Sequence, residues 1–491
     1  MSLPLGEQLK RRKPIVFQQM HHQGEELARN MGTFQLMMFG VGATVGTGIF
    51  FVLSESIPKA GAAVIISFVI AAIAAGLSAL CYAEMASAIP VSGSTYSYTY
   101  HALGEGAAVL IAGCVLLEYG VAVSAVAVGW SGYFNELLHN LFGFTLPTAL
   151  SVSFVPGEDG AATGGLINLP AVVLILLCML LLLRGVSESA TVNTIMVLIK
   201  LGVLLLFTAI GFSAFNADHF NNFFAQAAGI SAAAGTIFFS FIGLDAVATA
   251  GEEVKNPQKA LPRAIIGALL IVTIIYVLVA TGGLAAKPVE FFGTTEAGEA
   301  GLSKILTDVT GTPIWGTVLA AGAVISIFSV TLVTLYGQTR ILFAIGRDGL
   351  VPRKFLQVNQ KTMTPTYNTI VVSVLVAIVA GFVPSDYLWD TVSIGTLMAF
   401  SVVAISIMVL RRTHPDLERP FKVPLYPVIP ILTVVACVYV LSGLKPITWR
   451  IFGGWIAVVF AYYWFYGRRH ATLNTYKSLE EIAEPKGKDD E

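Results

Sequence analysis

Two apolar segments of membrane length in this chain are interrupted near their middles, and roughly two hundred residues separate the interruptions. The first contains four glycines within nine positions, from Gly40 to Gly48. The second is the run FSFIGLD from Phe239 to Asp245. Glycine destabilises a helix interior by about 1 kcal/mol relative to alanine, so continuous winding through the first segment is disfavoured. Because irregular backbone at membrane depth is tolerated only where it is buried or lines a cavity, we expect both interruptions to border a bound solute.

The composition is that of a polytopic membrane protein. Of the 491 residues, 55% are hydrophobic and 12% are charged, and the mean hydropathy is +0.76. The four cysteines stand apart from one another and the seven histidines are scattered, so neither a disulfide framework nor a metal signature is indicated. We therefore expect no metal, no organic cofactor and no nucleic-acid partner, and the lipid bilayer as the surroundings. Protein partners stay unknown.

Hydropathy predicts an all-α integral membrane protein with twelve spans of roughly 20 residues each. They cover residues 32–53, 62–88, 107–134, 168–184, 190–213, 232–250, 264–285, 314–341, 367–384, 387–410, 427–444 and 449–467. Overlaying the two interrupted segments gives an inverted repeat of five plus five helices, in residues 32–213 and 232–410, followed by two further spans in 427–467. Residues 1–31 form an N-terminal segment, and we expect the tail 468–491 to be disordered because it is polar and rich in charge.

The distribution of basic residues predicts the orientation. With the N-terminus in the cytoplasm, all but six of the 29 Lys and Arg residues fall on the cytoplasmic side. The exceptions are Lys59, Lys287, Lys304, Lys445 and Arg450 outside and Lys200 within a span. Positive charge is retained on the cytoplasmic side of membrane proteins, so we expect a multi-pass protein of the plasma (inner) membrane with both termini cytoplasmic.

The first interruption has the chemistry to bind a zwitterion. A helix that restarts at Gly46, Thr47 and Gly48 presents amide donors and the positive end of its dipole, which favours an anion. The last carbonyls before each interruption favour an ammonium group. An α-amino acid carries both charges a few ångströms apart and fits both helix ends. The rings of Phe239 and Phe241 could close over it, although ordinary packing explains them equally well.

Among the ionisable residues within or at the ends of the spans, where charge is costly and often functional, four are candidates for a role in the site. Lys200 sits deep in its span, where loss of hydration disfavours the charged amine, so it could gain and lose a proton near neutral pH; the alternative is a lysine that snorkels to the interface. Glu118 is a candidate for substrate contact and Glu84 for a gate, and either could instead have a structural role. Asp245 follows the second interruption and could cap a helix or contact substrate.

Several motifs together resemble the amino acid, polyamine and organocation (APC) transporter superfamily, most closely the bacterial relatives of the cationic amino acid transporters. The motifs are GATVGTGIF at 42–50, YAE at 82–84 with PVSGS at 90–94, LEYGVAVSAVAVGWSGY at 117–133, FSFIGLDAVATAGEEVKNP at 239–257, YGQTRILFAIGRDGLVP at 336–352 and RPFKVP at 419–424. The resemblance extends over about residues 32–467, nearly the whole apolar part of the chain.

The resemblance implies the LeuT-like fold with discontinuous first and sixth helices, alternating access, and a site between spans one, three, six, eight and ten. It places the carboxylate-binding loop on Gly46, Thr47 and Gly48. It places the ammonium-binding carbonyls on Thr44, Val45, Phe239, Ser240 and Ile242, with Phe239 also as the gating aromatic. Lys200 matches the lysine of proton-coupled relatives, and Glu118 matches the acid of the cationic group. Thr334 in span eight favours a polar or cationic side chain.

These observations predict a secondary active transporter of cationic or small neutral L-amino acids. The expected mechanism is proton-coupled symport, with the proton as coupling ion and no chemistry on the substrate. An amino acid exchanger of the same fold and a membrane amino acid sensor remain the alternatives. A membrane enzyme is disfavoured because the spans contain no set of nucleophile, base and orienting group.

Overall fold

The computed structural model describes residues 5–14, 31–91, 93–154, 164–184, 190–249, 254–293, 301–359, 362 and 364–475. These residues form an all-helical protein in which only two isolated β-bridges occur. The first half contains α1 (Leu5–Lys10), α3 (Thr33–Thr44), α4 (Thr47–Ala60), η1 (Gly61–Ala63), α5 (Val64–Ala88), α6 (Ser94–Ala102), α7 (Glu105–Phe142), α8 (Thr148–Ser151), α9 (Leu169–Leu183) and α10 (Ala190–Ser213).

The second half begins with short 3-10 turns and a broken helix. It contains η2 (Ala217–Phe220), η3 (Ala227–Gly229), α11 (Ile230–Phe238), η4 (Phe239–Phe241), α12 (Ala246–Thr249), α13 (Pro257–Ala286), α14 (Val289–Phe292), α15 (Gly301–Thr310), α16 (Pro313–Arg347), η5 (Arg353–Leu356), α17 (Thr366–Phe382), α18 (Ser385–Thr413), α19 (Val428–Ser442), α20 (Pro446–Tyr462), η6 (Tyr463–Gly467), α21 (Arg468–His470) and η7 (Thr472–Thr475).

Helix is present in each of the twelve predicted spans, but fewer of them meet a membrane-crossing criterion on their own. By length and composition, seven helical stretches in the described residues could cross a membrane, or eight if the pair 428–442 and 446–470, bent by 114°, is one span. The difference arises because the first predicted span is split between α3 and α4, and because α9 and α17 have only 15 and 17 residues. The twelve crossings therefore remain a prediction.

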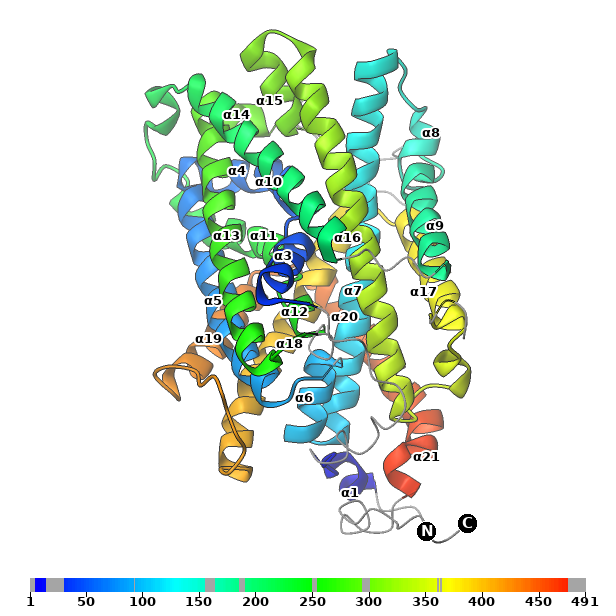
Figure 1. Ribbon diagram of the computed structural model, residues 1–491. Helices are drawn as coiled ribbons and strands as arrows, with labels where there is room; N and C mark the ends of the chain where they lie inside the picture. Colours follow the sequence, from blue (N-terminus) through cyan, green and yellow to red (C-terminus); the bar gives the residue numbers. More distant parts are fainter. Residues whose placement is uncertain are drawn as a thin grey trace.

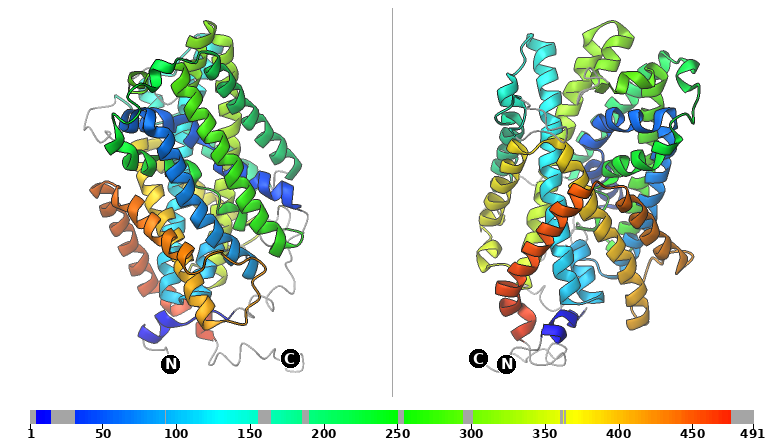
Figure 2. Two further views of the ribbon diagram at one scale, coloured as in Figure 1. Left: turned by 90° about the vertical axis from the view of Figure 1, so that its left-hand side faces the viewer. Right: turned by 180° about the vertical axis from the view of Figure 1, so that it is seen from behind.

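The helices pack as two groups. The long helices α7 and α16 lie along each other and, with α9 and α17, make what we call the frame group (Figure 1). The helices α3, α4, α5, α11 and α13 make the bundle group on the other side of the molecule (Figure 1). Helices α10 and α18 contact members of both groups, while α19 and α20 pack outside against α18, α5 and α7 (Figure 2).

The short helices α1 and α21 lie at the same end of the molecule (Figure 1). There the N-terminal segment is held by ion pairs from Arg11 to Glu105 and from Lys13 to Asp348, each with an N–O distance of 2.7 Å. The short elements α21 and η7 lie within residues 468–475, a part of the tail that we expected to be disordered, and Asn474 there accepts hydrogen bonds from Gln8 and Arg11. The rest of the predicted disordered tail, 476–491, lies outside the described residues.

Candidate functional site

The helical path stops and restarts at the first predicted interruption. Helix α3 ends at Thr44, and α4 begins at Thr47 after Gly46 adopts an extended conformation with φ −117° and ψ −151°. A β-carbon on Gly48 would lie 2.8 Å from the Cα atom of Ser240, which is closer than real β-carbons approach backbone. Glycine is therefore required here because the second interruption passes directly against the first.

The second interruption is built from a 3-10 turn followed by extended chain. After η4, Ile242 is extended and Gly243 has φ +104°, a conformation that glycine tolerates and L side chains rarely adopt. A β-carbon on Gly243 would lie 2.6 Å from the carbonyl oxygen of Ala43. The two interruptions thus touch at two places, Gly48 with Ser240 and Gly243 with Ala43.

Tyr276 on α13 joins the two interruptions by hydrogen bonding. Its buried hydroxyl lies 3.0 Å from the carbonyl oxygen of Thr44 and 2.8 Å from that of Ser240. Carbonyls at the end of a helix lack intrahelical donors, so a hydroxyl between the two helix ends satisfies part of that deficit. Sequence reasoning missed Tyr276, because nothing in an uninterrupted apolar span marks one tyrosine as facing both helix ends.

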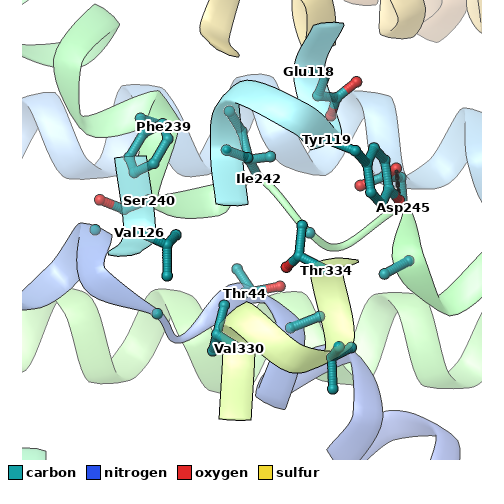
Figure 3. Close-up of a pocket in the computed structure, with 17 residues that line it drawn as sticks. Thr44, Glu118, Tyr119, Val126, Phe239, Ser240, Ile242, Asp245, Val330 and Thr334 are labelled. Atoms are coloured by element: carbon teal, nitrogen blue, oxygen red, sulfur yellow. Dashed lines mark hydrogen bonds between the residues drawn. The ribbon is translucent and has the colours of Figure 1, made fainter. Parts of the chain in front are cut away.

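A cavity lies beside the two interruptions (Figure 3). Its walls come from α3, α4, α7, α16 and the segment from η4 to α12. The lining residues are Ala43, Thr44, Gly46, Gly48, Glu118, Tyr119, Ala122, Val126, Phe239, Ser240, Ile242, Gly243, Asp245, Ala246, Val330, Val333 and Thr334. Most of these side chains are apolar, and Glu118 and Asp245 lie with Tyr119 at one end of the cavity (Figure 3).

Most of the predicted site residues meet at this cavity. Thr44, Gly46, Gly48, Glu118, Phe239, Ser240, Ile242, Asp245 and Thr334 all line it. Val45 is not among the lining residues; its side chain is fully buried, and its carbonyl oxygen accepts a hydrogen bond from Lys200. The backbone of Thr47 begins α4, but its side chain lies outside the described part of the structure.

The predicted ammonium acceptors are partly engaged by the protein itself. The carbonyl oxygen of Thr44 accepts from the amide of Gly46 at 2.9 Å and lies 3.0 Å from the Tyr276 hydroxyl. A carbonyl oxygen has two lone pairs, so an ammonium group would have to displace one of these donors. The hydroxyl of Thr44 donates back to Gly40 and does not replace them.

Lys200 reaches the first interruption from α10. Its side chain is fully buried, and its Nζ atom donates to the carbonyl oxygens of Gly42 at 3.0 Å and Val45 at 3.2 Å. These carbonyls lie at the C-terminal end of α3, where the helix dipole favours a cation. The amine therefore points to the helix end beside the cavity and does not snorkel to the surface.

The two carboxylates at the cavity differ in their surroundings. Asp245 precedes α12, and its Oδ2 accepts a 2.8 Å hydrogen bond from the hydroxyl of Tyr119. Glu118 is 2% exposed, and its Oε1 has no hydrogen-bond partner among the described residues. Burying an unsatisfied carboxyl oxygen is costly, so Glu118 has capacity for a donor that enters the cavity.

Helix α18 comes close to Glu118 at a glycine. A β-carbon on Gly395 would lie 3.2 Å from the Cβ atom of Glu118 and 2.9 Å from the carbonyl oxygen of Cys114.

Tyr119, which lines the cavity, was missed by the sequence reasoning. The available signal was its position directly after Glu118, since successive helical residues point about 100° apart and both could therefore border one cavity.

Glu84 lies away from the cavity and fastens a loop. Its carboxylate accepts from Nε and Nη2 of Arg411 at 2.8 and 2.6 Å and from the amide of Val423 at 2.6 Å. Arg419 stands 3.7 Å away and donates to carbonyls of the same loop. Glu84 therefore ties the end of α5 to α18 and to the connection before α19, the arrangement of a structural acid.

In the described residues, no group of three His, Cys, Asp or Glu side chains could hold a metal ion. The cavity therefore offers hydrogen-bonding groups, two helix ends and two carboxylates, but no metal-ligand set among those residues. Such a site can bind a small polar molecule between two packed groups of helices. Nothing in the described lining supplies a nucleophile beside a base.

Comparison with known proteins identifies the family. The model of the amino acid permease family matches residues 31–468. The methylthioribose transporter of Bacillus subtilis (strain 168) is 40% identical over 468 residues, 95% of this chain and 99% of that protein. The branched-chain amino acid permease BcaP of the same organism is 42% identical over 452 residues, 92% of this chain and 95% of its own length. The vacuolar cationic amino acid transporter 4 of Arabidopsis thaliana is 35% identical over 80% of this chain and 64% of its own. The chain therefore belongs to the amino acid permease family and is a multi-pass membrane transporter, not an enzyme.

Proposed function

We propose that the chain is a proton-coupled symporter that carries amino acids into the cell by alternating access. The observation that carries the proposal is the placement of Lys200. Its Nζ atom bonds Gly42 and Val45, which flank residues that line the cavity. A protonated lysine holds the end of α3 in the observed position, and a neutral amine would hold it less strongly because the attraction of a cation to the helix end is lost.

The packing supports an inverted repeat of five plus five helices with twelve membrane crossings. We take α3–α10 as the first repeat and α11–α18 as the second. Each of the first four membrane spans of the first repeat then packs against the corresponding span of the second. These pairs are α4 with α11, α5 with α13, α7 with α16, and α9 with α17. Counterparts related by a pseudo-two-fold axis meet across that axis, which accounts for this pattern. With both termini cytoplasmic, α1 and α21 mark the inner face, and the bacterial relatives favour the plasma membrane.

The cavity favours an amino acid with a small or branched neutral side chain. The N-terminal end of α4 at Gly46 and Gly48 suits the carboxylate, and Ala122, Val126 and Val330 provide apolar surface for the side chain. The relative BcaP is named for branched-chain amino acids, which agrees with that surface. Glu118 leaves cationic side chains as the second choice, since its free oxygen could accept from an ammonium or guanidinium group.

A second candidate substrate comes from the methylthioribose transporter. A sugar thioether has hydroxyl groups but no carboxylate and no ammonium. It could donate hydrogen bonds to Glu118 and Asp245 and place its methylthio group on the apolar wall. It would leave the α4 N-terminal end without an anion, so the two candidate substrates predict different competitors.

Uptake into proteoliposomes tests the proposal. We expect radiolabelled leucine, isoleucine or alanine to accumulate when the outside is more acidic than the inside, and to accumulate little without the pH gradient. Decarboxylated amines and amino acid methyl esters should compete poorly because they lack the carboxylate. Methylthioribose competing better than every amino acid would replace the amino acid proposal. Accumulation that requires amino acid inside the vesicle and ignores the pH gradient would favour the exchanger, and binding without flux would favour the sensor.

Variants of two lysines make the coupling test specific. Lys200→Ala should bind substrate yet lose at least tenfold of the pH-driven accumulation. Lys59→Ala is the matched control, because Lys59 is partly exposed and pairs with Glu55 at the surface. Wild-type dependence on the pH gradient in Lys200→Ala protein would contradict the coupling role.

A further inference from the structure

Three aromatic side chains from three separate elements stack beside the cavity, and we call them the aromatic cap. They are Phe51 of α4, Phe239 of η4 and Trp389 of α18. The ring centroids of Phe239 and Trp389 are 4.4 Å apart at an interplanar angle of 72°. Those of Phe51 and Trp389 are 5.1 Å apart at 22°. Trp389 is therefore the central ring, held edge-to-face on one side and stacked on the other.

The aromatic cap lies on one side of the cavity. Phe239 lines the cavity, whereas Trp389 and Phe51 lie behind it. On α18, Trp389 comes six residues before Gly395, which packs against Glu118, so it lies about 9 Å along the helix from that level. Because α18 runs from there toward Arg411 and the end that carries α1 and α21, the cap lies on the opposite side of the cavity.

The contacts of the cap join parts of the molecule that belong to different groups. Phe51 lies on α4 of the bundle group and Phe239 in η4, directly after α11 of that group, while Trp389 lies on α18, which also packs along α7 of the frame group. Phe50 directly precedes Phe51, and its carbonyl oxygen accepts a 2.8 Å hydrogen bond from the hydroxyl of Tyr133 on α7. Separation of Phe51 and Phe239 from α18 on this side therefore breaks the ring contacts at Trp389.

The indole nitrogen of Trp389 is a second and independent observation. It is buried and has no hydrogen-bond acceptor among the described residues. The corresponding nitrogen of Trp130 in α7, also buried, donates to the carbonyl oxygen of Val324 at 2.9 Å. A buried N–H without an acceptor disfavours the closed arrangement, and the ring contacts favour it. This opposition suits a contact that must form and break in each cycle.

We propose that Trp389 positions the gate: it holds the ring of Phe239 over the cavity, and the route to the cavity opposite α1 and α21 opens when these two rings separate. The inference rests on the proposed transport function and adds a residue to it. The three cap residues come from segments far apart in the chain, so the closure is a tertiary contact. When the rings separate, water can hydrate the indole N–H, which favours the open state.

Reactivity of a single cysteine in the cavity tests the proposal. The four natural cysteines, all buried, are replaced by alanine, and Ala122→Cys supplies a thiol in the cavity wall on α7. A membrane-impermeant methanethiosulfonate reagent is added to intact cells and, separately, to inside-out vesicles. A cleavable N-terminal tag identifies the face that carries the N-terminus. We expect Trp389→Ala to raise the modification rate at least fivefold from the opposite face and less than twofold from the tag's face.

The matched control is Trp130→Ala, which also removes a buried tryptophan, one whose ring stacks on Phe134 and whose indole nitrogen donates to Val324. Its modification rate should stay within twofold of the parent from both faces. Equal rates in Trp389→Ala and the parent, or a rise from both faces, would overturn the gate. If Trp389→Ala does not give folded protein, Trp389→Leu, which keeps apolar volume but loses the planar ring, provides the same comparison.

The experiment separates this inference from the proposed function. Cysteine modification requires no substrate and no pH gradient, so it reports the gate even in a protein whose substrate is unidentified. Failure of the proposed function would appear as absence of amino acid uptake by the wild-type protein, with the face-dependent modification pattern intact. Failure of the gate would appear as an unchanged pattern in Trp389→Ala alongside normal wild-type uptake.

Discussion

The hydroxyl of Tyr119 donates a 2.8 Å hydrogen bond to Oδ2 of Asp245 within the wall of the cavity. Tyr119 belongs to α7 of the frame group, and Asp245 precedes α12 at the second interruption. The bond therefore joins α7 of the frame group to the second interruption at the level of the cavity, whereas the aromatic cap joins α4 and η4 to α18 on one side of it.

Replacing Tyr119 by phenylalanine removes this bond and leaves a buried carboxyl oxygen without its donor. We expect the folded protein to lose about 1–3 kcal/mol of stability, because an unsatisfied buried acceptor costs that much. The change is measured as a lower midpoint of thermal unfolding in detergent. Tyr439→Phe on α19 is the control, since that tyrosine is 50% exposed. Equal midpoints in Tyr119→Phe and the control would show that the bond does not stabilise this state.

Replacing Gly48 by alanine should separate the two interruptions. The new β-carbon would meet the Cα atom of Ser240 at 2.8 Å, and backbone cannot move aside as a flexible side chain can. We expect amino acid uptake to fall more than tenfold. Gly202→Ala in α10 is the matched control, because a β-carbon there has nothing within 4 Å and alanine favours the helix. Uptake by Gly48→Ala equal to that of Gly202→Ala would disprove the need for close contact.

The role of Glu118 is decided by comparing two substrates. If its carboxylate is ionised and faces the cavity, Glu118→Gln should weaken binding of arginine at least tenfold and change binding of alanine less than twofold. The reason is that a carboxylate attracts a cation far more strongly in a low-dielectric cavity than in water. Binding of both amino acids is measured on wild-type and variant protein in parallel. Parallel losses for arginine and alanine would instead indicate that Glu118 supports the packing of α7 on α18 at Gly395.

His101 in α6, outside the predicted spans, makes stability depend on pH. Burial of the ring, reinforced by the positive charge of Lys13, lowers the pKa of His101 from 6.5 to about 4. Its Nδ1 lies 2.6 Å from the carbonyl oxygen of Lys13, so Nδ1–H donates to that oxygen. The folded state favours the neutral ring, so this contribution is fully present above pH 6.5 and is lost as the pH falls from 6.5 toward 4.

The loss attributable to His101 should reach on the order of 3 kcal/mol at the acidic end of this range. Thermal unfolding of detergent-solubilised protein at pH 7.5, 6, 5 and 4 measures it. His101→Asn keeps a nitrogen donor for the Lys13 carbonyl but cannot be protonated, so its unfolding midpoint should fall less steeply with acid than that of the wild type. Identical pH profiles for the two proteins would exclude this histidine as the cause.

Local composition was sufficient for several features of this protein. Four glycines between Gly40 and Gly48 disfavour helix wherever that segment lies, and the structure breaks α3 from α4 at Val45 and Gly46. The glycine and aspartate at Gly243 and Asp245 mark the second break in the same way. Apolar runs of membrane length fixed the membrane class, and helix is present in every predicted span. Length alone does not determine the number of crossings, because breaks and short helices such as α9 divide the hydrophobic segments.

Only the tertiary structure decided which side chains meet. Tyr119 with Asp245, Tyr276 with Thr44 and Trp389 with Phe239 are contacts between residues more than 100 positions apart, and the residues around each partner look like ordinary apolar helix. The packing of bundle on frame sets these pairs, and so no local pattern encodes them.

Tertiary packing also explains why the two predicted acids Glu84 and Glu118 have different surroundings. Glu84 and Glu118 are similar in sequence context, yet Arg411 and the amide of Val423 satisfy Glu84, while Glu118 keeps an unsatisfied oxygen at the cavity. Residue type and depth determined that each acid needs a partner, because a buried charge or dipole without one is costly. Helices that are distant in the sequence and adjacent in the fold decide whether that partner is a protein group or an incoming solute.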